Sequence, residues 1–130
     1  MARTRRLLPT DTLEGNEVIN QAGENLGKIE TFMIDPEEGR VAYAVLSFGG
    51  FLGMGNKLFA VPMQALMPVP EQHKFVLNES KERLENAPGF DKDHWPDMAD
   101  PAWGTGIYDY YGFDPYWDRG PKDDDLRLRP

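Results

Sequence analysis

The stretch LGKIETFMIDPEEGRVAYAVLSFGGFLGMGNKLFAVP, residues 26–62, decides the fold of this 130-residue chain. It predicts three short strands, at about residues 27–34, 40–48 and 58–61. The second of them is rich in Val, Tyr and Phe and carries almost no charge. We therefore expect it to be covered on both faces or to lie at the centre of a barrel, and to be the middle strand of the sheet. Pro62 cannot donate a hydrogen bond to a neighbouring strand, so it marks the end of the third strand.

The two connections within this stretch differ in kind. Asp35, Pro36 and Gly39 are typical of a tight turn, because the aspartate accepts bonds from the backbone ahead, proline fixes φ and glycine tolerates positive φ. The second connection is the glycine-rich segment 49–55, which we expect to fold back over one end of a barrel. It carries three large apolar side chains: Phe51, Leu52 and Met54.

Three further strands are predicted outside this stretch. Residues 17–20 and 74–77 are short apolar segments between turn signals, and the proline-interrupted segment 63–70 predicts a turn followed by an irregular edge strand. Within residues 27–34 the polarity changes from one face to the other, which indicates either a β-bulge or burial on both sides near the Asp35 turn. About six strands with closely spaced turns predict a mainly β fold, a small six-stranded antiparallel barrel.

A set of short motifs spread over residues 11–78 carries a resemblance to a known family. They are Gly15, Val18, Ile19 and Asn20; Gly23 through Ile29; Asp35 with Gly39; Tyr43 through Ser47; Gly49, Gly50, Phe51, Leu52 and Gly53; and Ala60, Val61 and Pro62 before Ala65 and Leu66. Together they resemble the PRC barrel, the cytoplasmic domain of the photosynthetic reaction-centre H subunit and one domain of a ribosome-maturation factor. The resemblance implies a small β-barrel that binds other macromolecules, and it carries no catalytic signature.

The part of the chain beyond the barrel has a different composition. Asn78 or Ser80 can cap a short helix that ends before Pro88. Residues 90–117 hold nine of the fifteen aromatic residues, separated by prolines, glycines and aspartates, so we expect an irregular aromatic extension. The predicted organisation has four parts: a flexible basic arm at 1–10, the PRC-type barrel at 11–78, the short helix with the aromatic and acidic extension packed on the barrel at 79–118, and a disordered charged tail at 119–130.

Charge and cysteine content limit the classes of function. Residues 1–66 carry 6 basic and 8 acidic side chains and residues 67–130 carry 8 and 14, which gives the total of −8. An acidic chain is repelled by phosphate backbones, so we do not expect general binding to nucleic acid. The absence of cysteine excludes disulfides and thiolate sites and fits the cytoplasm. No window approaches the length of a membrane-spanning helix, so docking to a membrane would be peripheral.

The sequence offers little support for catalysis, a cofactor or a metal. The glycine-rich segment 49–55 lacks the Lys-Ser/Thr of a P-loop, and no helix is predicted after it. His94 lies among aspartates, but these lack the order of a calcium-binding loop. The other histidine is His73, and no serine or threonine stands in a nucleophile motif. We therefore expect a protein that is not an enzyme and holds no cofactor or metal.

The aromatic extension is the strongest functional candidate, and two interpretations are open. Its rings either cover the chain's own barrel or form an interface, because aromatic residues dominate binding hot spots. We expect a protein–protein interaction module that self-associates, as a homodimer. The predicted contact residues are Phe51, Leu52, Met54, Trp95, Trp103, Tyr110, Tyr111 and Trp117. By resemblance, two alternatives remain: an accessory protein of photosynthetic or electron-transport complexes, and an RNA-processing or ribosome-assembly factor.

Overall fold

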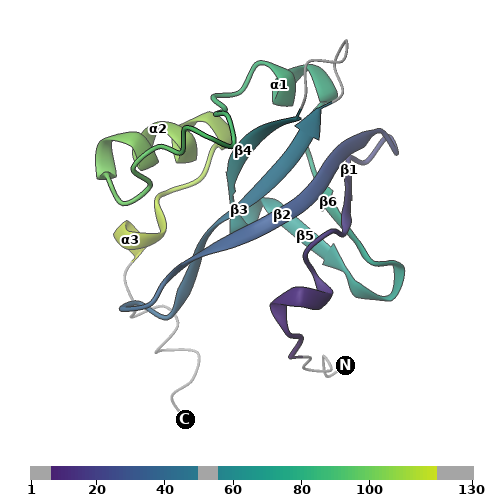
Figure 1. The fold of residues 1–130 in the computed structure, drawn as a ribbon, viewed down its shortest axis with the longest axis horizontal. Coiled ribbons are helices and arrows are strands. Elements are labelled where there is room, and N and C mark those ends of the chain that lie inside the picture. Colours follow the sequence, from purple (N-terminus) through teal and green to yellow (C-terminus); the bar gives the residue numbers. More distant parts are fainter. Residues whose placement is uncertain (1–6, 50–55, 120–130) are drawn as a thin grey trace.

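The structure, a computed structural model, describes residues 7–49 and 56–119. Its centre is a curved sheet of six strands, in the order β4-β3-β2-β1-β6-β5 (Figure 1). The strands are β1 (Glu17–Ile19), β2 (Asn25–Asp35), β3 (Arg40–Gly49), β4 (Asn56–Pro62), β5 (Leu66–Val69) and β6 (Lys74–Leu77). The mainly β class and the six strands are as predicted from the sequence.

One strand pairing corrects the prediction of an antiparallel barrel. β1 pairs antiparallel with β2 but parallel with β6, where Val18 lies opposite Phe75. The remaining pairings in the sheet are antiparallel, so the sheet is mixed. The hairpin with β5 sets the direction of β6. No tight turn connects β1 directly to β6, so these two strands are not required to be antiparallel. A three-residue strand such as β1 carries no sequence signal for the direction of its neighbour.

The hairpin between β2 and β3 forms as its turn residues predict. The carboxylate of Asp35 accepts bonds from the backbone N–H groups of Glu37 and Glu38, both at 3.1 Å. The N–H of Gly39 donates to the carbonyl of Asp35 at 2.8 Å, and Gly39 has a φ of +67°. The β2–β3 register shifts twice, between residues 29 and 31 and between residues 33 and 34. The first shift places the extra residue on β2 and confirms the predicted bulge there, and the second places the extra residue on β3.

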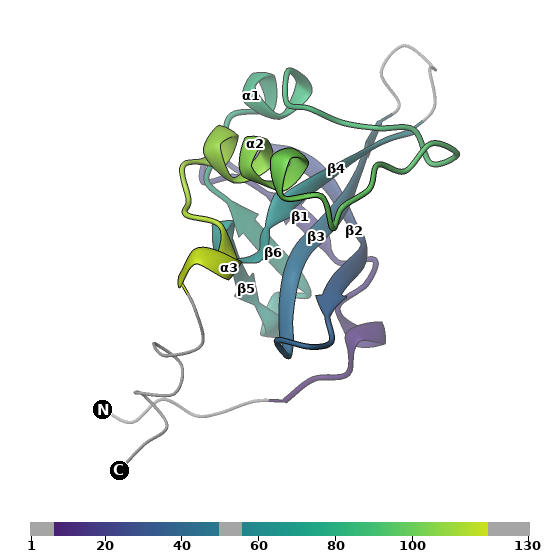
Figure 2. The same ribbon diagram turned by 90° about the vertical axis from the view of Figure 1, so that its left-hand side faces the viewer.

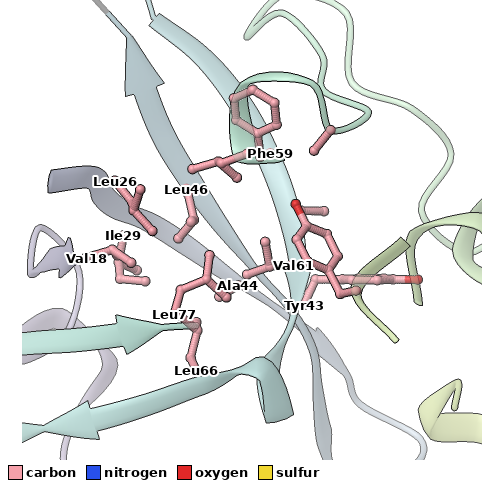
Figure 3. Close-up of a cluster of buried hydrophobic side chains, with 14 of the residues drawn as sticks. Val18, Leu26, Ile29, Tyr43, Ala44, Leu46, Phe59, Val61, Leu66 and Leu77 are labelled. Carbon is pink, nitrogen blue, oxygen red and sulfur yellow. The ribbon is translucent and has the colours of Figure 1, made fainter. Parts of the chain in front are cut away.

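The hydrophobic core fills the inside of the curved sheet (Figure 3). Leu26, Ile29 and Leu46 are at most 2% exposed, and each buried side chain of this size contributes roughly 1.5–3 kcal/mol to stability. Residues 42–46 of β3 are buried on both faces, as predicted, because helix α2 and its neighbours pack on the outer face. β3 lies second in the strand order, and not in the middle as expected.

Within the described residues, three helices and three 3₁₀ turns accompany the sheet. The helices are α1 (Lys81–Glu85), α2 (Pro101–Tyr111) and α3 (Tyr116–Arg119), and the turns are η1 (Thr10–Thr12), η3 (Met63–Ala65) and η4 (Pro70–Gln72). α1 is the predicted short helix, and the hydroxyl of Ser80 caps it by accepting from the N–H of Arg83 at 3.0 Å. η3 turns the chain into β5, the predicted edge strand, which contains Pro68.

The extension is not irregular, because α2 and α3 lie within it on one side of the sheet (Figure 2). Asp100 caps α2 by accepting from the N–H of Ala102 at 3.0 Å, Pro101 occupies the first turn, and Gly112 ends the helix with a φ of +81°. Asp-Pro at the start and Gly at the end are ordinary helix boundary signals. The prediction was wrong because Gly104 and Gly106, poor helix formers, stand inside the segment.

Candidate functional site

The aromatic extension, residues 90–117, is held against the sheet first at the edge of β4. The N–H of Leu58 donates to the carbonyl of Phe90 at 2.9 Å, and the N–H of Phe90 donates to the carbonyl of Leu58 at 2.8 Å. Trp95 packs on the Phe90 ring, with 5.0 Å between ring centroids, and its indole N–H donates to the carbonyl of Lys92. β4 pairs with β3 on one side, and these bonds satisfy part of its backbone on the other side, where no described strand lies.

Helix α2 brings a cluster of rings onto the outer face of β3. Tyr108 is fully buried, and its hydroxyl donates to the carbonyl of Ala42 at 2.7 Å. Tyr43 contacts Tyr108 and Trp103, each with 5.4 Å between ring centroids. Trp117 of α3 lies edge-on to Tyr108 at 5.9 Å. The rings of the extension therefore form one continuous cluster with the core of the barrel.

The aromatic cluster packs so closely on α2 that position 104 has no room for a side chain, whereas position 106 has. A Cβ atom at Gly104 would lie 2.5 Å from the hydroxyl of Tyr43 and 2.7 Å from the Trp117 ring, whereas one at Gly106 would meet nothing within 4 Å. We expect Gly106→Ala to raise the free energy of unfolding by about 1 kcal/mol, the gain in helix propensity. We expect Gly104→Ala to lower it by about 1–2 kcal/mol, because overpacking outweighs that gain. Urea unfolding of the two variants checks this pair, and equal effects would contradict the packing of α2.

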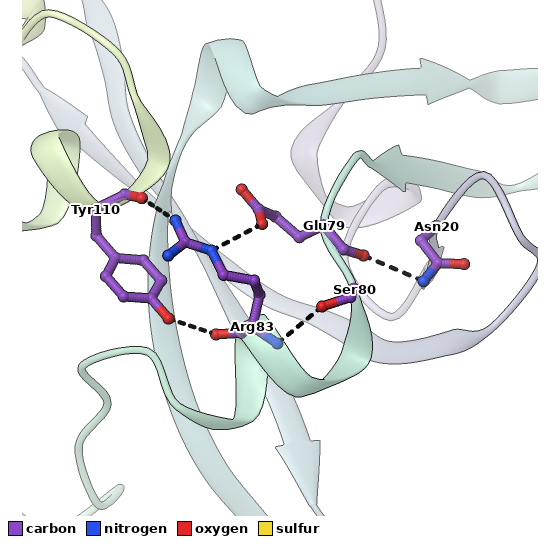
Figure 4. Close-up of polar contacts among 5 residues, drawn as sticks. All are labelled: Asn20, Glu79, Ser80, Arg83 and Tyr110. Carbon is purple, nitrogen blue, oxygen red and sulfur yellow. Dashed lines mark hydrogen bonds and ion pairs between the residues drawn. The ribbon is translucent and has the colours of Figure 1, made fainter.

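A second group of polar contacts ties α1 to the end of α2 (Figure 4). The guanidinium of Arg83 lies 4.0 Å from the centroid of the Tyr110 ring and donates to the Tyr110 carbonyl, while the Tyr110 hydroxyl donates to the carbonyl of Arg83 at 2.7 Å. Arg83 also pairs with Glu79 at 3.2 Å. The amide of Asn20 donates to the carbonyl of Glu79 at 3.1 Å. Tyr110 is thus held in place by both its ring and its backbone.

A third contact joins α3 to the tip of the β2–β3 hairpin. The hydroxyl of Tyr116 donates to the carboxylate of Asp35 at 2.5 Å, and the guanidinium of Arg40 donates to the Tyr116 carbonyl at 2.8 Å. The bond from Tyr116, with the backbone bonds in the turn, holds the pKa of the Asp35 carboxyl below its usual range. The carboxylate that shapes the turn therefore also fixes the end of the extension.

The raised pKa values of three tyrosines in this region predict a loss of stability at alkaline pH. Burial raises the pKa values of Tyr43 and Tyr111 above the ordinary 10.0, and burial together with the bond to Asp35 raises that of Tyr116. A raised folded-state pKa contributes stability that is complete below the unfolded-state value and is lost as pH rises above it. We expect the free energy of unfolding to fall above about pH 10.

Urea unfolding between about pH 8 and 11, with tyrosinate absorbance recorded in parallel, checks this expectation. Tyr116→Phe should show a smaller alkaline loss than the unchanged chain, because one of the three shifted phenols is gone. Ionisation of all five tyrosines before any unfolding would contradict it.

The predicted contact residues occupy three different environments. Trp95 is 42% exposed, whereas Trp103, Tyr110 and Trp117 are half-buried against the core cluster. Tyr111 is buried, at 7% exposed, and its hydroxyl has no hydrogen-bond partner among the described residues. Phe51, Leu52 and Met54 lie outside the described residues. The half-buried rings are therefore partly accessible to solvent and partly packed against the core.

The same segment carries many exposed carboxylates. The extension and the following residue carry seven acidic side chains, all of them exposed: Asp91, Asp93, Asp97, Asp100, Asp109, Asp114 and Asp118. The same segment has one basic side chain, Lys92, which is also exposed. In the described ranges, no three His, Cys, Asp or Glu side chains gather closely enough to hold a metal ion. The extension therefore combines partly exposed aromatic rings with a strong excess of negative charge.

The comparison with protein-family models agrees with this architecture. The PRC-barrel domain family matches residues 9–84. A search of the curated proteins finds no match. A solved structure that matches is RimM of Pseudomonas aeruginosa, a protein assigned to 16S ribosomal RNA processing, at 18% identity and a TM-score of 0.40. That match covers 58% of this chain and 45% of the RimM chain. No helix within the described part of the chain is both long and apolar enough to span a membrane. Since the family match covers more than half of its residues, the chain belongs to the PRC-barrel family.

Proposed function

We propose that this PRC-barrel chain is not an enzyme and that it acts by binding a protein partner through the aromatic extension. The observation that carries the proposal is the combination of half-exposed aromatic rings and exposed carboxylates on a segment fixed to the barrel. Trp95 is the most exposed of these rings. Trp and Tyr dominate interface hot spots, and a rigid surface loses little conformational entropy when it binds.

The charge of the extension favours a partner with a basic surface. Seven exposed aspartates and one lysine give residues 90–118 a net charge of −6. Complementary charge accelerates encounter and excludes acidic competitors. A homodimer remains part of the proposal, but two extensions facing each other would set like charges together. The barrel, residues 11–78, is acidic as well, with nine acidic and four basic side chains, so two copies that dock by their barrels also bring like charges together.

The experiment compares capture of a partner by the full chain and by two matched variants. Trp95→Ala removes the exposed ring of the extension, and Met67→Ala removes an exposed apolar side chain of β5, 63% exposed, outside the extension. We expect Trp95→Ala to weaken binding at least about 30-fold, the effect of losing a hot spot, and Met67→Ala to leave it unchanged. Light scattering on the same samples measures self-association.

Point variants are preferable to deletion of the extension. Ile107 and Tyr108 belong to the core, so a chain ending before α2 would expose the outer face of β3 and lose stability. Unchanged capture by a folded Trp95→Ala variant, together with loss of capture by Met67→Ala, would assign the contact to the sheet edge and contradict the proposal.

The two alternative functions are outcomes of the same capture experiment. A partner set that disappears on nuclease treatment would favour RNA processing or ribosome assembly, in which case the interface belongs to a ribonucleoprotein. Sedimentation of the chain with native membranes, abolished by salt, would favour docking to photosynthetic or electron-transport complexes. A nuclease-resistant protein partner that depends on Trp95 favours the proposed function.

A further inference from the structure

The outer face of strands β1, β6 and β5 lies apart from the aromatic extension (Figure 1). Val18 of β1 and Phe75 of β6 are buried in the core. Because side chains alternate along a strand, their neighbours Ile19 and Val76 point to the outer face. Both are half-buried and neither belongs to the core cluster. Among the described helices, α2 and α3 pack on β3 and α1 contacts β2, so this face is formed by strands alone.

Three apolar side chains form a row across this face. Ile19 of β1 lies beside Val76 of β6, and Val76 lies opposite Met67 of β5. Neighbouring strands are about 5 Å apart, so these side chains are close enough to form a continuous surface. Met67 is 63% exposed. Covering the row would remove apolar area from water, which favours association.

A row of charged side chains runs beside the apolar row, two residues away on β1 and on β6. Glu17 of β1 lies between Lys28 of β2 and Lys74 of β6. The Glu17 carboxylate lies 3.9 Å from the Lys74 ammonium and accepts from the side-chain amide of Asn25 at 2.8 Å. The side chains of Lys74 and Glu17 are 36% and 40% exposed. The signs of the charges therefore alternate across the three strands, in the order positive, negative, positive.

The charge of this face differs from that of the barrel as a whole. The charged row has two lysines and one glutamate, and including the exposed Glu30 of β2 and Glu71 of η4 at its margins gives a net charge of −1. The charged residues of the neighbouring helix α1 sum to zero: Lys81, Glu82, Arg83 and Glu85. Charges farther away than about 8 Å are largely screened at physiological ionic strength. Two copies can therefore approach by this face with little repulsion, although the chain carries −8.

We propose that two copies of the chain associate through this face, about a twofold axis that runs along the strands between β1 and β6. The axis places β1 of each copy over β6 of the other, in the aligned arrangement of two packed sheets. Glu17 then faces Lys74 of the second copy, and Ile19 faces Val76 of the second copy, each of them twice. The parallel register of β1 and β6 makes the pattern complementary to itself. This inference rests on the self-association included in the proposed function, and it names the surface.

The face is small, so we expect weak association. Standard interfaces use about 20–30 residues from each partner, whereas the two rows supply six. We expect a monomer–dimer equilibrium with a dissociation constant of roughly 0.1 mM. Sedimentation velocity of the full chain, over concentrations from about 0.01 to 1 mM, measures it.

Two charge reversals test the facing pairs. Glu17→Lys and Lys74→Glu should each weaken self-association at least about tenfold, because each sets like charges against each other. An equimolar mixture of the two variants should associate, because every facing pair in the mixed dimer is then of opposite charge. Glu37→Lys and Lys57→Glu form the matched control pair, since they make the same changes of charge at exposed positions outside the face. Each control variant and their mixture should associate as the unchanged chain does.

Met67→Ala tests the apolar row without changing any charge. Its side chain is mostly exposed, so the variant should remain folded and should weaken self-association several-fold. It also keeps the proposal testable if a charge reversal prevents folding.

Three results would overturn the proposal. The first is a chain that stays monomeric at 1 mM. The second is a dimer that withstands Met67→Ala and both charge reversals in the face, which would place the contact elsewhere. The third is equal association in the control mixture and in the test mixture, which would make overall charge the cause. Partner capture is measured separately: loss of capture in Trp95→Ala tests the proposed interface of the extension, and it does not depend on the dimer.

Discussion

Replacing Gly27 with alanine should lower the free energy of unfolding by about 3–5 kcal/mol, because two costs add. The positive φ of +109° is strained for a residue with a side chain. The new methyl group would also overlap the backbone of β3 at Ser47, so β2 and β3 would have to separate beside the buried Leu26 and Ile29. Equilibrium urea unfolding measures the loss.

Gly23→Ala is the matched control for this change. Gly23 also has a positive φ, +85°, but a Cβ atom there would meet nothing within 4 Å. We expect it to cost only the conformational penalty of about 1–2 kcal/mol. Equal losses in the two variants would mean that β2 and β3 are not in contact at Gly27.

Replacing Tyr108 with alanine should lower the free energy of unfolding by about 3–5 kcal/mol, the usual cost of removing a buried aromatic side chain. Tyr108 is fully buried, and its ring contacts Tyr43 of β3 and Trp117 of α3. The substitution would remove the centre of the ring cluster that holds α2 and α3 on the sheet. We expect the fluorescence of Trp103 and Trp117 to shift toward that of solvent-exposed tryptophan.

Phenylalanine variants separate the contribution of the tyrosine hydroxyl to stability from that of the ring. Tyr108→Phe should cost about 1–2 kcal/mol, because it leaves the carbonyl of Ala42 without the 2.7 Å bond from Tyr108. Tyr111→Phe should be near neutral, because the buried hydroxyl of Tyr111 has no partner within the described residues. If the two variants lose the same stability, the bond between α2 and β3 contributes nothing measurable.

Much of the barrel could be predicted from interactions between residues that are close together in the chain. The Asp35 turn, the bulge in β2 and the Ser80 cap of α1 each depend on local chemistry, and each forms as expected. The helix α2 was missed although Asp100, Pro101 and Gly112 mark its ends, because its interior contains Gly104 and Gly106. Gly104 is explained only by the rings of Tyr43 and Trp117, which reach it from other elements.

Local sequence also could not reveal which aromatic rings remain available at the surface. Nine aromatic residues stand close together in the chain, yet Tyr108 and Tyr111 are buried while Trp95 is 42% exposed. The difference depends on which side of α2 meets β3 and on where Phe90 joins the edge of β4. Likewise, Ile19, Met67 and Val76 come from three separate segments of the sequence, and only the fold places them side by side on one face.

The sequence by itself determined the mainly β class, the six strands, the hairpin turn and the acidic character of the chain, because these depend on alternation, turn residues and composition. Only the tertiary structure decided the parallel pairing of β1 with β6, the helical form of the extension and the row of Ile19, Val76 and Met67 on the outer face of the barrel. These features join residues that are distant in the chain. Their energy comes from packing and backbone pairing between elements, which no local pattern of residues specifies.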